Sequence, residues 1–504
     1  MFSTSVYNDP LRFSEMLKTK SEAYWQERGD IFALSLFHAA AEYVPAYKDF
    51  LLQQGIRPES VQTIQDFHQL PTLNKDNYLR AYPLEALCWK GKFKENRWTI
   101  STTSGSTGEP FYFPRTKRQD HQYALMAELY LRENFQIHRR STLYIDAFPM
   151  GPWIGGVFTY EAIRMVAERG KYPLSIITTG TQKAEIIKTV RRLGSHFDQV
   201  LIGCYGPFLK DALDDGIQQG LDWSQYPLGF IFSAEGFTES FRDYVAQRAG
   251  LQDLYRGTLN HYGTVDLGTM AHETPLTILA RRIAVDRVPL FESLFGQTTK
   301  LPTFCQFIPE LFHFEEQQGG LVCTANSGLP LVRYDLKDHG GVKPLHEVHS
   351  LFREQNIDLE KAATTRGLSN SIMQLPCVFV YERSDFSVSL YAFQIYPETI
   401  RKALQHVAFS QHITGKFTMI TKYDAGQNQY LEINIELRPG AHISQLLEAS
   451  MQEQIVTSLL RESSEYAKTY SEVPQRVMPH LVFWPYEDRL FFAPGTKQHW
   501  VQKA

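Results

Sequence analysis

Between residues 97 and 236 the chain alternates short apolar runs with longer stretches of helical periodicity. The apolar runs are bounded by turn residues and cover 97–102, 142–148, 174–180, 199–206 and 228–236. Stretches such as 121–134 and 184–194, which lie between these runs, carry apolar residues at three- and four-residue spacing. Strands that alternate with helices are typical of βαβ units. The pattern predicts an α/β fold with a largely parallel sheet.

The two ends of the chain differ from this middle part. The first ninety residues have helical periodicity throughout. The polar, irregular segment 354–371 predicts a surface loop, and beyond it alternating strands and amphipathic helices predict a compact α+β unit with its own core. We therefore expect a large N-terminal domain over 1–384, with residues 1–90 helical, and a small C-terminal domain over 385–504.

Composition excludes several classes of protein. Lys and Arg number 51 against 55 Asp and Glu, a net charge of −4, which provides no basic surface for nucleic acid or anionic membranes. The five cysteines form no CxxC pair, which favours free thiols in a reducing compartment over disulfides or a zinc site. The first residues do not resemble a signal peptide, and no apolar run approaches the ~18 residues of a membrane span. We expect a cytoplasmic protein without nucleic-acid or membrane partners.

The strongest chemical signal is the segment Thr102–Pro110, with the sequence TTSGSTGEP, directly after an apolar run. Its two glycines allow a tight turn in which backbone N–H groups converge, and its hydroxyls add further donors. The segment predicts a phosphate cradle, although it lacks the GxxxxGK[ST] pattern of a Walker loop. A flexible Ser/Thr/Gly surface turn is the alternative interpretation.

The segment resembles the phosphate loop of the adenylate-forming superfamily, which contains acyl-CoA synthetases, peptide-synthetase adenylation domains and luciferases. Further segments resemble motifs of this family in the same order: His261–Gly268, Leu329–Asp338, Tyr381–Asp385 and Ile395–Glu398. The run Phe232–Phe237 (FSAEGF) is most similar to the phenylacetate–CoA ligase branch.

The resemblance implies a fold and a function. The fold is a large N-terminal multi-sheet α/β domain with a small, mobile C-terminal α+β domain. The function is that of an ATP- and Mg²⁺-dependent ligase, which activates a small carboxylic acid as acyl-AMP with release of pyrophosphate. It then transfers the acyl group to a thiol, with CoA as the default co-substrate. Homodimers are common among such proteins.

The resemblance also assigns roles to residues of the nucleotide site. Asp266 is the acidic Mg²⁺ ligand and a catalytic residue, and Asp338 accepts hydrogen bonds from the ribose hydroxyls. Arg333, the second catalytic candidate, and Arg383 lie near ribose or phosphate. The phosphates are held by Thr103, Ser104, Gly105, Ser106, Thr107 and Gly108. The adenine and its surroundings involve Glu235, Gly236, Phe237, Tyr262, Gly263 and Thr264.

Further roles concern the acid and the small domain. The aromatic, glycine-rich segment Phe148–Phe158 resembles the one that borders the acyl group in the family, and it implies an acyl pocket at Trp153, Gly155 and Gly156. Such a pocket suits an aromatic acid. The family's catalytic lysine corresponds to Lys497 or its rival Lys503. The hinge between the domains corresponds to Asp385.

Several positions depart from the family pattern and keep alternatives open. Val265 replaces a hydroxyl residue, Asp266 replaces Glu, Glu109 replaces Lys, and Glu382 and Ala392 replace glycines. Since the glycine segment near Ala392 borders the pantetheine tunnel in thioester-forming members, the acceptor can instead be an amine or a carrier-protein thiol. A non-catalytic nucleotide-binding relative is a third reading. Locally, Arg333 and Asp338 can also be a surface ion pair, Asp266 a helix N-cap and Lys497 part of a frayed tail.

Overall fold

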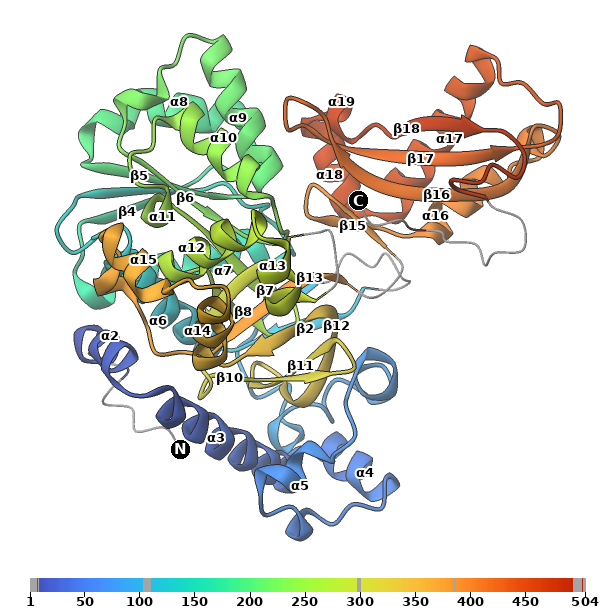
Figure 1. The fold of residues 1–504 in the computed structure, drawn as a ribbon. Helices are drawn as coiled ribbons and strands as arrows, with labels where there is room; N and C mark the ends of the chain where they lie inside the picture. The colour runs from blue at the N-terminus through green and yellow to red at the C-terminus, as the bar shows by residue number, and fades with distance from the viewer. Residues whose placement is uncertain are drawn as a thin grey trace.

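The structure is a computed structural model that describes residues 7, 9–102, 110–296, 301–383, 387–492 and 501, without the side chains of residues 382 and 383. A large body contains the chain from the N-terminus to β13, and a smaller C-terminal unit lies beside it (Figure 1). No helix among these residues is long and apolar enough to cross a membrane.

One long sheet forms the centre of the large body. Its strands lie in the order β10 (Phe312–Gln317), β11 (Gly320–Asn326), β12 (Pro330–Lys343), β13 (Cys377–Arg383), β9 (Thr303–Phe307), β8 (Gly268–His272), β7 (Thr258–Thr264), β6 (Leu228–Phe232), β5 (Gln199–Cys204), β3 (Thr142–Asp146) and β4 (Leu174–Thr178). From β4 to β7 neighbouring strands run parallel, whereas from β7 to β10 they run antiparallel. The α/β prediction is confirmed, but the sheet is parallel in only one part.

The first apolar run does not join this sheet. β1 (Thr99–Thr102) pairs with β2 (Tyr112–Arg115) in a separate antiparallel hairpin. The expectation that the apolar run 97–102 contributes to the largely parallel sheet was therefore wrong. The reason is that the next segment returns directly as a partner strand, without the crossover helix that a parallel pair requires.

The parallel part of the sheet is covered on both faces. Alternate residues of a strand point to opposite faces, so on β3 Leu143 and Ile145 pack on one side and Tyr144 on the other. The first side is covered by α8 (Lys183–Leu193), α9 (Gly206–Gln218) and α10 (Glu239–Ala249). The second is covered by α6 (Lys117–Glu133) and α7 (Ile154–Gly170). Both faces are therefore buried, as expected of parallel strands.

A further helical layer packs near Phe304 and Phe379 of the antiparallel part. It contains α12 (Pro275–Val285), α13 (Val288–Phe295), α14 (Leu345–Glu354) and α15 (Leu359–Thr365), and the short α11 (Leu254–Gly257) precedes β7. The loop predicted over 354–371 was wrong in its centre. Asp358 caps α15, and the helix buries Leu359 and Ala363, an apolar pair too sparse to stand out in the sequence.

The described N-terminal part is largely helical up to His68, whereas 69–90 are mostly turns. It contains α2 (Pro10–Thr19), α3 (Glu22–Tyr43), α4 (Pro45–Gln53) and α5 (Ile64–His68). α3 crosses β10, β11 and β12 and shares one hydrophobic core with them. Short helical turns occupy Pro58–Ser60, Lys75–Leu79, Trp89–Gly91, Gly194–His196, Trp223–Gln225, Ser369–Ser371 and Val407–Phe409.

The C-terminal unit has a core of its own, which contains buried side chains from Val388 to Val477. β14 (Val388–Leu390) pairs with β15 (Phe393–Ile395), and a second sheet contains β16 (Ile413–Tyr423), β17 (Gln429–Leu437) and β18 (His480–Trp484). Its helices are α16 (Pro397–Leu404), α17 (Gln445–Glu462), α18 (Ser464–Glu472) and α19 (Pro474–Val477). The expected hinge, Asp385, lies outside the described residues, so the domain boundary stays a prediction.

Candidate active site

Asp266 lies in the turn between β7 and β8, with 8% of its surface exposed. The hydroxyl of Tyr334 on β12 donates a hydrogen bond to its Oδ2 (2.6 Å), and the ammonium of Lys75 lies 3.5 Å from its Oδ1. The turn is fixed because the Leu267 N–H donates to the Thr264 hydroxyl (3.2 Å). Asp266 is therefore a buried, partnered carboxylate in a strand-to-strand turn and does not cap a helix.

Asp338 is the second buried carboxylate of this region, with 7% of its surface exposed. It lies on β12, and the hydroxyl of Tyr262 on β7 donates to its Oδ2 at 2.6 Å. The Tyr262 ring stacks on Phe314 of β10, with ring centres 6.0 Å apart. Two Tyr–Asp hydrogen bonds therefore join β12 to the β7–β8 hairpin and hold both carboxylates in place.

A Mg²⁺ ion requires oxygen ligands and usually takes one or two carboxylates together with substrate phosphates. Asp266 fits this requirement, although the Lys75 ammonium would have to move away from its Oδ1. The described residues also place His68, His313 and Glu315 within 4.8 Å of one another. Burial lowers the pKa of His313 to about 3, so this ring is neutral.

Arg333 forms a buried structural contact in this structure. Its guanidinium donates to both carboxylate oxygens of Glu315 on β10 (3.1 and 3.0 Å from Nε) and to the Leu70 carbonyl. The backbone of Arg333 has φ +46°, and its N–H donates to the Thr324 hydroxyl (2.8 Å). Arg333 thus joins the N-terminal helical part to the sheet, and its contact with ribose or phosphate stays a prediction.

The expected phosphate loop connects β1 and β2. Six of its predicted ligands, Thr103, Ser104, Gly105, Ser106, Thr107 and Gly108, lie outside the described residues. Two contacts hold the end of the hairpin next to the loop. Thr102 pairs with Tyr112, and the Thr102 N–H donates a hydrogen bond to the Pro152 carbonyl (2.9 Å). The ring of Phe113 on β2 lies 5.9 Å from the Lys75 ammonium, which also contacts Asp266. The hairpin therefore brings the two ends of the loop close to the Asp266 region.

The segment after β6 carries three further predicted residues, which are Glu235, Gly236 and Phe237. Ala234 has φ +76°, and the Asn260 amide donates to the Glu235 carbonyl (3.0 Å). The side chain of Phe237 is buried against Phe232, with ring centres 4.9 Å apart, and the Arg242 guanidinium lies 4.9 Å from its ring centre. The Phe237 ring therefore belongs to the core, and the backbone of this segment is what remains for contact with an adenine.

Glycine is required by close packing at two predicted positions. A Cβ atom at Gly263 would lie 2.7 Å from the Gly268 carbonyl oxygen across the β7–β8 hairpin. A Cβ atom at Gly156 in the first turn of α7 would lie 2.6 Å from the Pro149 carbonyl oxygen. Gly155 is less restricted, since its Cβ would meet the Phe148 side chain at 3.3 Å. Gly155 and Gly156 allow α7 to begin directly against the 148–150 segment.

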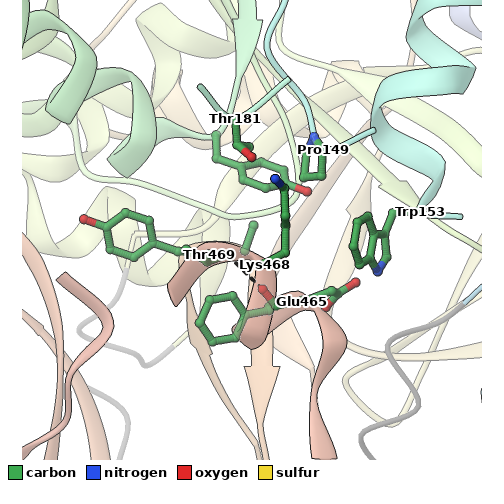
Figure 2. A pocket seen from close by; sticks show the side chains of 10 residues that line it. Pro149, Trp153, Thr181, Glu465, Lys468 and Thr469 are labelled. Carbon is green, nitrogen blue, oxygen red and sulfur yellow. Dashed lines mark hydrogen bonds between the residues drawn. The ribbon is translucent and has the colours of Figure 1, made fainter. Parts of the chain in front are cut away.

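A cavity opens between the large body and the C-terminal unit. It encloses about 310 Å³ of empty space, including open solvent, and Figure 2 shows the side chains around it. Its lining residues are Pro149, Trp153, Thr181 and Tyr205 from the large body and Tyr391, Ala392, Phe393, Glu465, Lys468 and Thr469 from the C-terminal unit. The predicted acyl-pocket residue Trp153 and the predicted departure Ala392 therefore face the same cavity.

Hydrogen bonds and ion pairs connect the two parts beside this cavity. Asp211 on α9 accepts a hydrogen bond from the Tyr391 hydroxyl (2.8 Å) and lies 3.3 Å from Nε of Arg476. The Gln429 amide of β17 donates to the Glu235 carboxylate (3.1 Å). The pKa of Asp211 is raised because burial outweighs these favourable contacts. We call the three residues Asp211, Tyr391 and Arg476 the interdomain latch.

Glu465 is a cavity residue that the sequence analysis did not identify. It lies in the first turn of α18, and burial raises its pKa to about 7. Lys75 and Tyr334 were also missed as site residues. Tyr334 lies inside a matched motif and could have been found there, whereas no local pattern distinguishes Lys75 or Glu465 from ordinary charged residues of helical segments.

Four predicted residues cannot be compared with the structure in full. Lys497, Lys503 and Asp385 lie outside the described residues, as does the side chain of Arg383. The main chain of Arg383 pairs with Asp338, the predicted ribose ligand, across β12 and β13. Val501 forms a bridge with Met419 of β16, which places that residue of the C-terminal segment on the small sheet.

Of the comparisons with known proteins, only the one with solved structures finds similar proteins, and it identifies the fold of this chain. No family model matches the sequence, and no curated protein matches it. Among solved structures, the chain is similar to 2-hydroxyisobutyryl-CoA ligase in complex with 2-HIB-AMP and CoA in the thioesterification state. The identity is 12%, the match covers 97% of this chain and 91% of the other, and the TM-score is 0.59.

The same ligase in two other states is also similar. An open conformation in complex with 2-HIB-AMP and CoA gives a TM-score of 0.54 at 12% identity, covering 97% of this chain and 94% of the other. The postadenylation state in complex with 2-HIB-AMP gives 0.51 at 13% identity, covering 97% and 92%. The thioesterification state has the highest score of these three. The chain therefore has the adenylate-forming ligase fold that the motifs predicted.

Proposed function

We propose that this chain is an ATP-dependent ligase that activates a carboxylic acid as acyl-AMP, releases pyrophosphate and transfers the acyl group to the thiol of CoA. The observation that carries this proposal is the convergence of three predicted parts of a nucleotide site. The hairpin that brackets the Ser/Thr/Gly loop lies beside Lys75, Lys75 contacts Asp266, and β12 carries both Asp338 and the Tyr334 partner of Asp266.

In this proposal each carboxylate has one task. Asp338 accepts hydrogen bonds from the ribose hydroxyls, a task that suits an ionised carboxylate because it only accepts. Asp266 holds Mg²⁺, which supplies positive charge to the phosphates as the negative acid approaches. The tyrosines position the carboxylates, since each hydroxyl already donates to the carboxylate of the other segment.

The cavity between the two parts supports a second half-reaction. It contains Trp153 from the predicted acyl pocket and faces α18 of the C-terminal unit. Of the three states of the similar ligase, the thioesterification state gives the highest TM-score. An acceptor that enters this cavity would reach an acyl group bound near Trp153.

An amine acceptor or a carrier-protein thiol is the second candidate. Tyr391, Ala392 and Phe393 line the cavity where thioester-forming relatives carry glycine. These side chains would narrow the space for a pantetheine arm, which CoA and carrier proteins both present, and would therefore favour an amine. The aromatic lining also supports an aromatic acid as the substrate.

The test is release of pyrophosphate from ATP and Mg²⁺ across a panel of aryl and short-chain acids, with and without CoA. We expect release with a subset of the acids, stimulation by CoA and loss of release when Mg²⁺ is omitted. Stimulation by amines or carrier proteins in place of CoA would favour the second candidate. ATP binding without release for any acid would overturn the proposal in favour of a non-catalytic nucleotide-binding protein.

A further inference from the structure

The cavity between the two parts is lined by the carboxylate of Glu465, which takes part in none of the hydrogen bonds or ion pairs among the described residues. Glu465 is the second residue of α18, whose N-cap Ser463 accepts a hydrogen bond from the Tyr466 N–H (3.1 Å). The backbone carbonyl of Glu465 accepts a hydrogen bond from the Thr469 hydroxyl (2.9 Å). Figure 2 shows its side chain directed from α18 towards Trp153, across the cavity.

The Glu465 carboxylate is neither paired nor hydrogen-bonded among the described residues of the chain. The neighbouring cation of the cavity, Lys468, instead pairs with Glu472 on the same helix (2.9 Å). Burial raises the pKa of Glu465 to about 7, and no opposite charge lowers it. A half-buried carboxylate without a partner is costly for a fold, and carboxylates with raised pKa values in clefts concentrate at functional sites.

Other polar groups face the same space. The indole nitrogen of Trp153 and the hydroxyl of Thr181 are buried without hydrogen-bond partners in the part of the chain that the structure describes. Tyr205 faces the cavity from the large body, with a pKa raised by burial and then by Glu465. Tyr391 faces it from the C-terminal unit, with a pKa raised by burial and then by Asp211. Neither tyrosine can accept a proton near neutral pH.

We propose that Glu465 is the general base of the transfer step, a role that rests on the proposed ligase function. It removes the proton from the acceptor thiol as the sulfur attacks the carbonyl carbon of the acyl-adenylate. The new C–S bond forms, the bond between the acyl carbon and the phosphate oxygen breaks, and AMP leaves with the electron pair. The proton stays on Glu465 until solvent removes it.

The chemistry of the cavity suits a thiol. The ordinary pKa of a thiol is about 8.5, whereas that of an alkylammonium group is about 10.4. A base that titrates near 7 is therefore better matched to a thiol than to an amine. Lys468 is a poor candidate for the base, because its side-chain nitrogen is paired with Glu472.

The experiment separates the two half-reactions of Glu465→Gln. ATP–pyrophosphate exchange measures adenylation, and single-turnover transfer to CoA measures the second step. The transfer substrate is synthetic benzoyl-AMP, replaced by the adenylate of the most active acid of the pyrophosphate panel if that acid is different. We expect transfer to fall about 100-fold or more while exchange stays within about twofold, because a general base typically contributes ~10²–10⁴-fold.

The pH profile provides a readout that a structural role would not change. In the wild-type chain the transfer rate should rise with pH through about 7 and then level off. Glu465→Gln should lose this inflection, and Glu465→Asp should keep an inflection with a lower plateau. Glu453→Gln on the neighbouring α17 is the matched control, since Glu453 is exposed and does not line the cavity.

Stability measurements separate loss of the base from loss of the fold. Glu465 binds its proton more tightly in the folded chain, so wild-type stability falls as pH rises from about 4.5 to about 7. Glu465→Gln lacks this loss, and its melting temperature relative to the wild type should be higher at pH 8 than at pH 5.

The remaining outcomes overturn the inference. Wild-type transfer by Glu465→Gln, or equal loss of exchange and transfer, would remove Glu465 as the base while leaving the ligase function intact. Absence of pyrophosphate release by the wild type with every acid would overturn the function and the inference together.

Discussion

The interdomain latch offers a way to change the balance between two domain arrangements. The resemblance predicts that the C-terminal unit alternates between an adenylating and a transferring pose. Tyr391→Phe removes the hydroxyl that donates to Asp211 (2.8 Å) and keeps the ring that lines the cavity. Arg476 remains 3.3 Å from the same carboxylate, so the variant loses one contact of the latch rather than all of it.

The size of the effect follows from the type of bond. A hydrogen bond to a charged group contributes ~1.5–3 kcal/mol, and 1.4 kcal/mol corresponds to a factor of ten in an equilibrium. The loss of about 2 kcal/mol would therefore reduce the population of the observed arrangement relative to the alternative about 30-fold. The cavity proposed for the transfer step is formed in the observed arrangement, so we expect this arrangement to be the transferring pose.

The assay compares ATP–pyrophosphate exchange with single-turnover transfer to CoA. For Tyr391→Phe we expect faster exchange and slower transfer than in the wild type. Tyr244→Phe is the matched control, because its hydroxyl donates to Asp214 of the same helix α9 (2.9 Å) but both residues lie in the large body. Equal effects of the two variants, or unchanged rates of both half-reactions in Tyr391→Phe, would refute the role of the latch in selecting the pose.

Three further outcomes test the site and the fold. Lys497→Ala should abolish pyrophosphate exchange and leave transfer from a supplied adenylate intact; equal loss of both would exclude Lys497 as the adenylation lysine. Asp338→Asn should weaken ATP binding about tenfold in calorimetry, since it removes a charged acceptor for the ribose hydroxyls. An unchanged affinity would place the ribose elsewhere. Gly328→Ala should lower the free energy of unfolding by about 3 kcal/mol in urea titrations, because a Cβ there would lie 1.6 Å from the Pro114 carbonyl oxygen. Wild-type stability would contradict that packing.

The sequence analysis named those candidate site residues that lie within short local motifs. Asp266 and Tyr262 lie within one short motif on the β7–β8 hairpin, and Asp338 lies within another on β12. The resemblance of these motifs to those of the family is enough to name the residues as candidates. Lys75 contacts Asp266 from a segment almost two hundred residues earlier, and Glu465 reaches the cavity from α18. Such residues are brought to the site only by the folded chain.

The same difference between local and long-range information explains which part of the sheet can be predicted from the sequence. Alternation of strands and helices identifies βαβ units because the crossover helix lies next to both strands in the sequence. The strands β8 to β13 pair through hairpins and long-range contacts, and several are short. Their antiparallel arrangement depends on which distant segment lies beside them. The periodicity of a single strand does not contain that information.

The turn at Tyr391 and Ala392 shows how a departure from the family pattern can keep its backbone geometry. Both residues have positive φ, +47° and +67°, where glycine is normally preferred and other residues cost about 1 kcal/mol or more. The Gln429 side chain accepts a hydrogen bond from the Tyr391 N–H (2.7 Å), and Asp211 accepts one from its hydroxyl (2.8 Å). These bonds offset the strain of the turn, and the second is made across the domain interface. A glycine at position 391 could adopt the same turn without strain but could not form the contact with Asp211. Tyr391 therefore couples the shape of the cavity to the arrangement of the two parts.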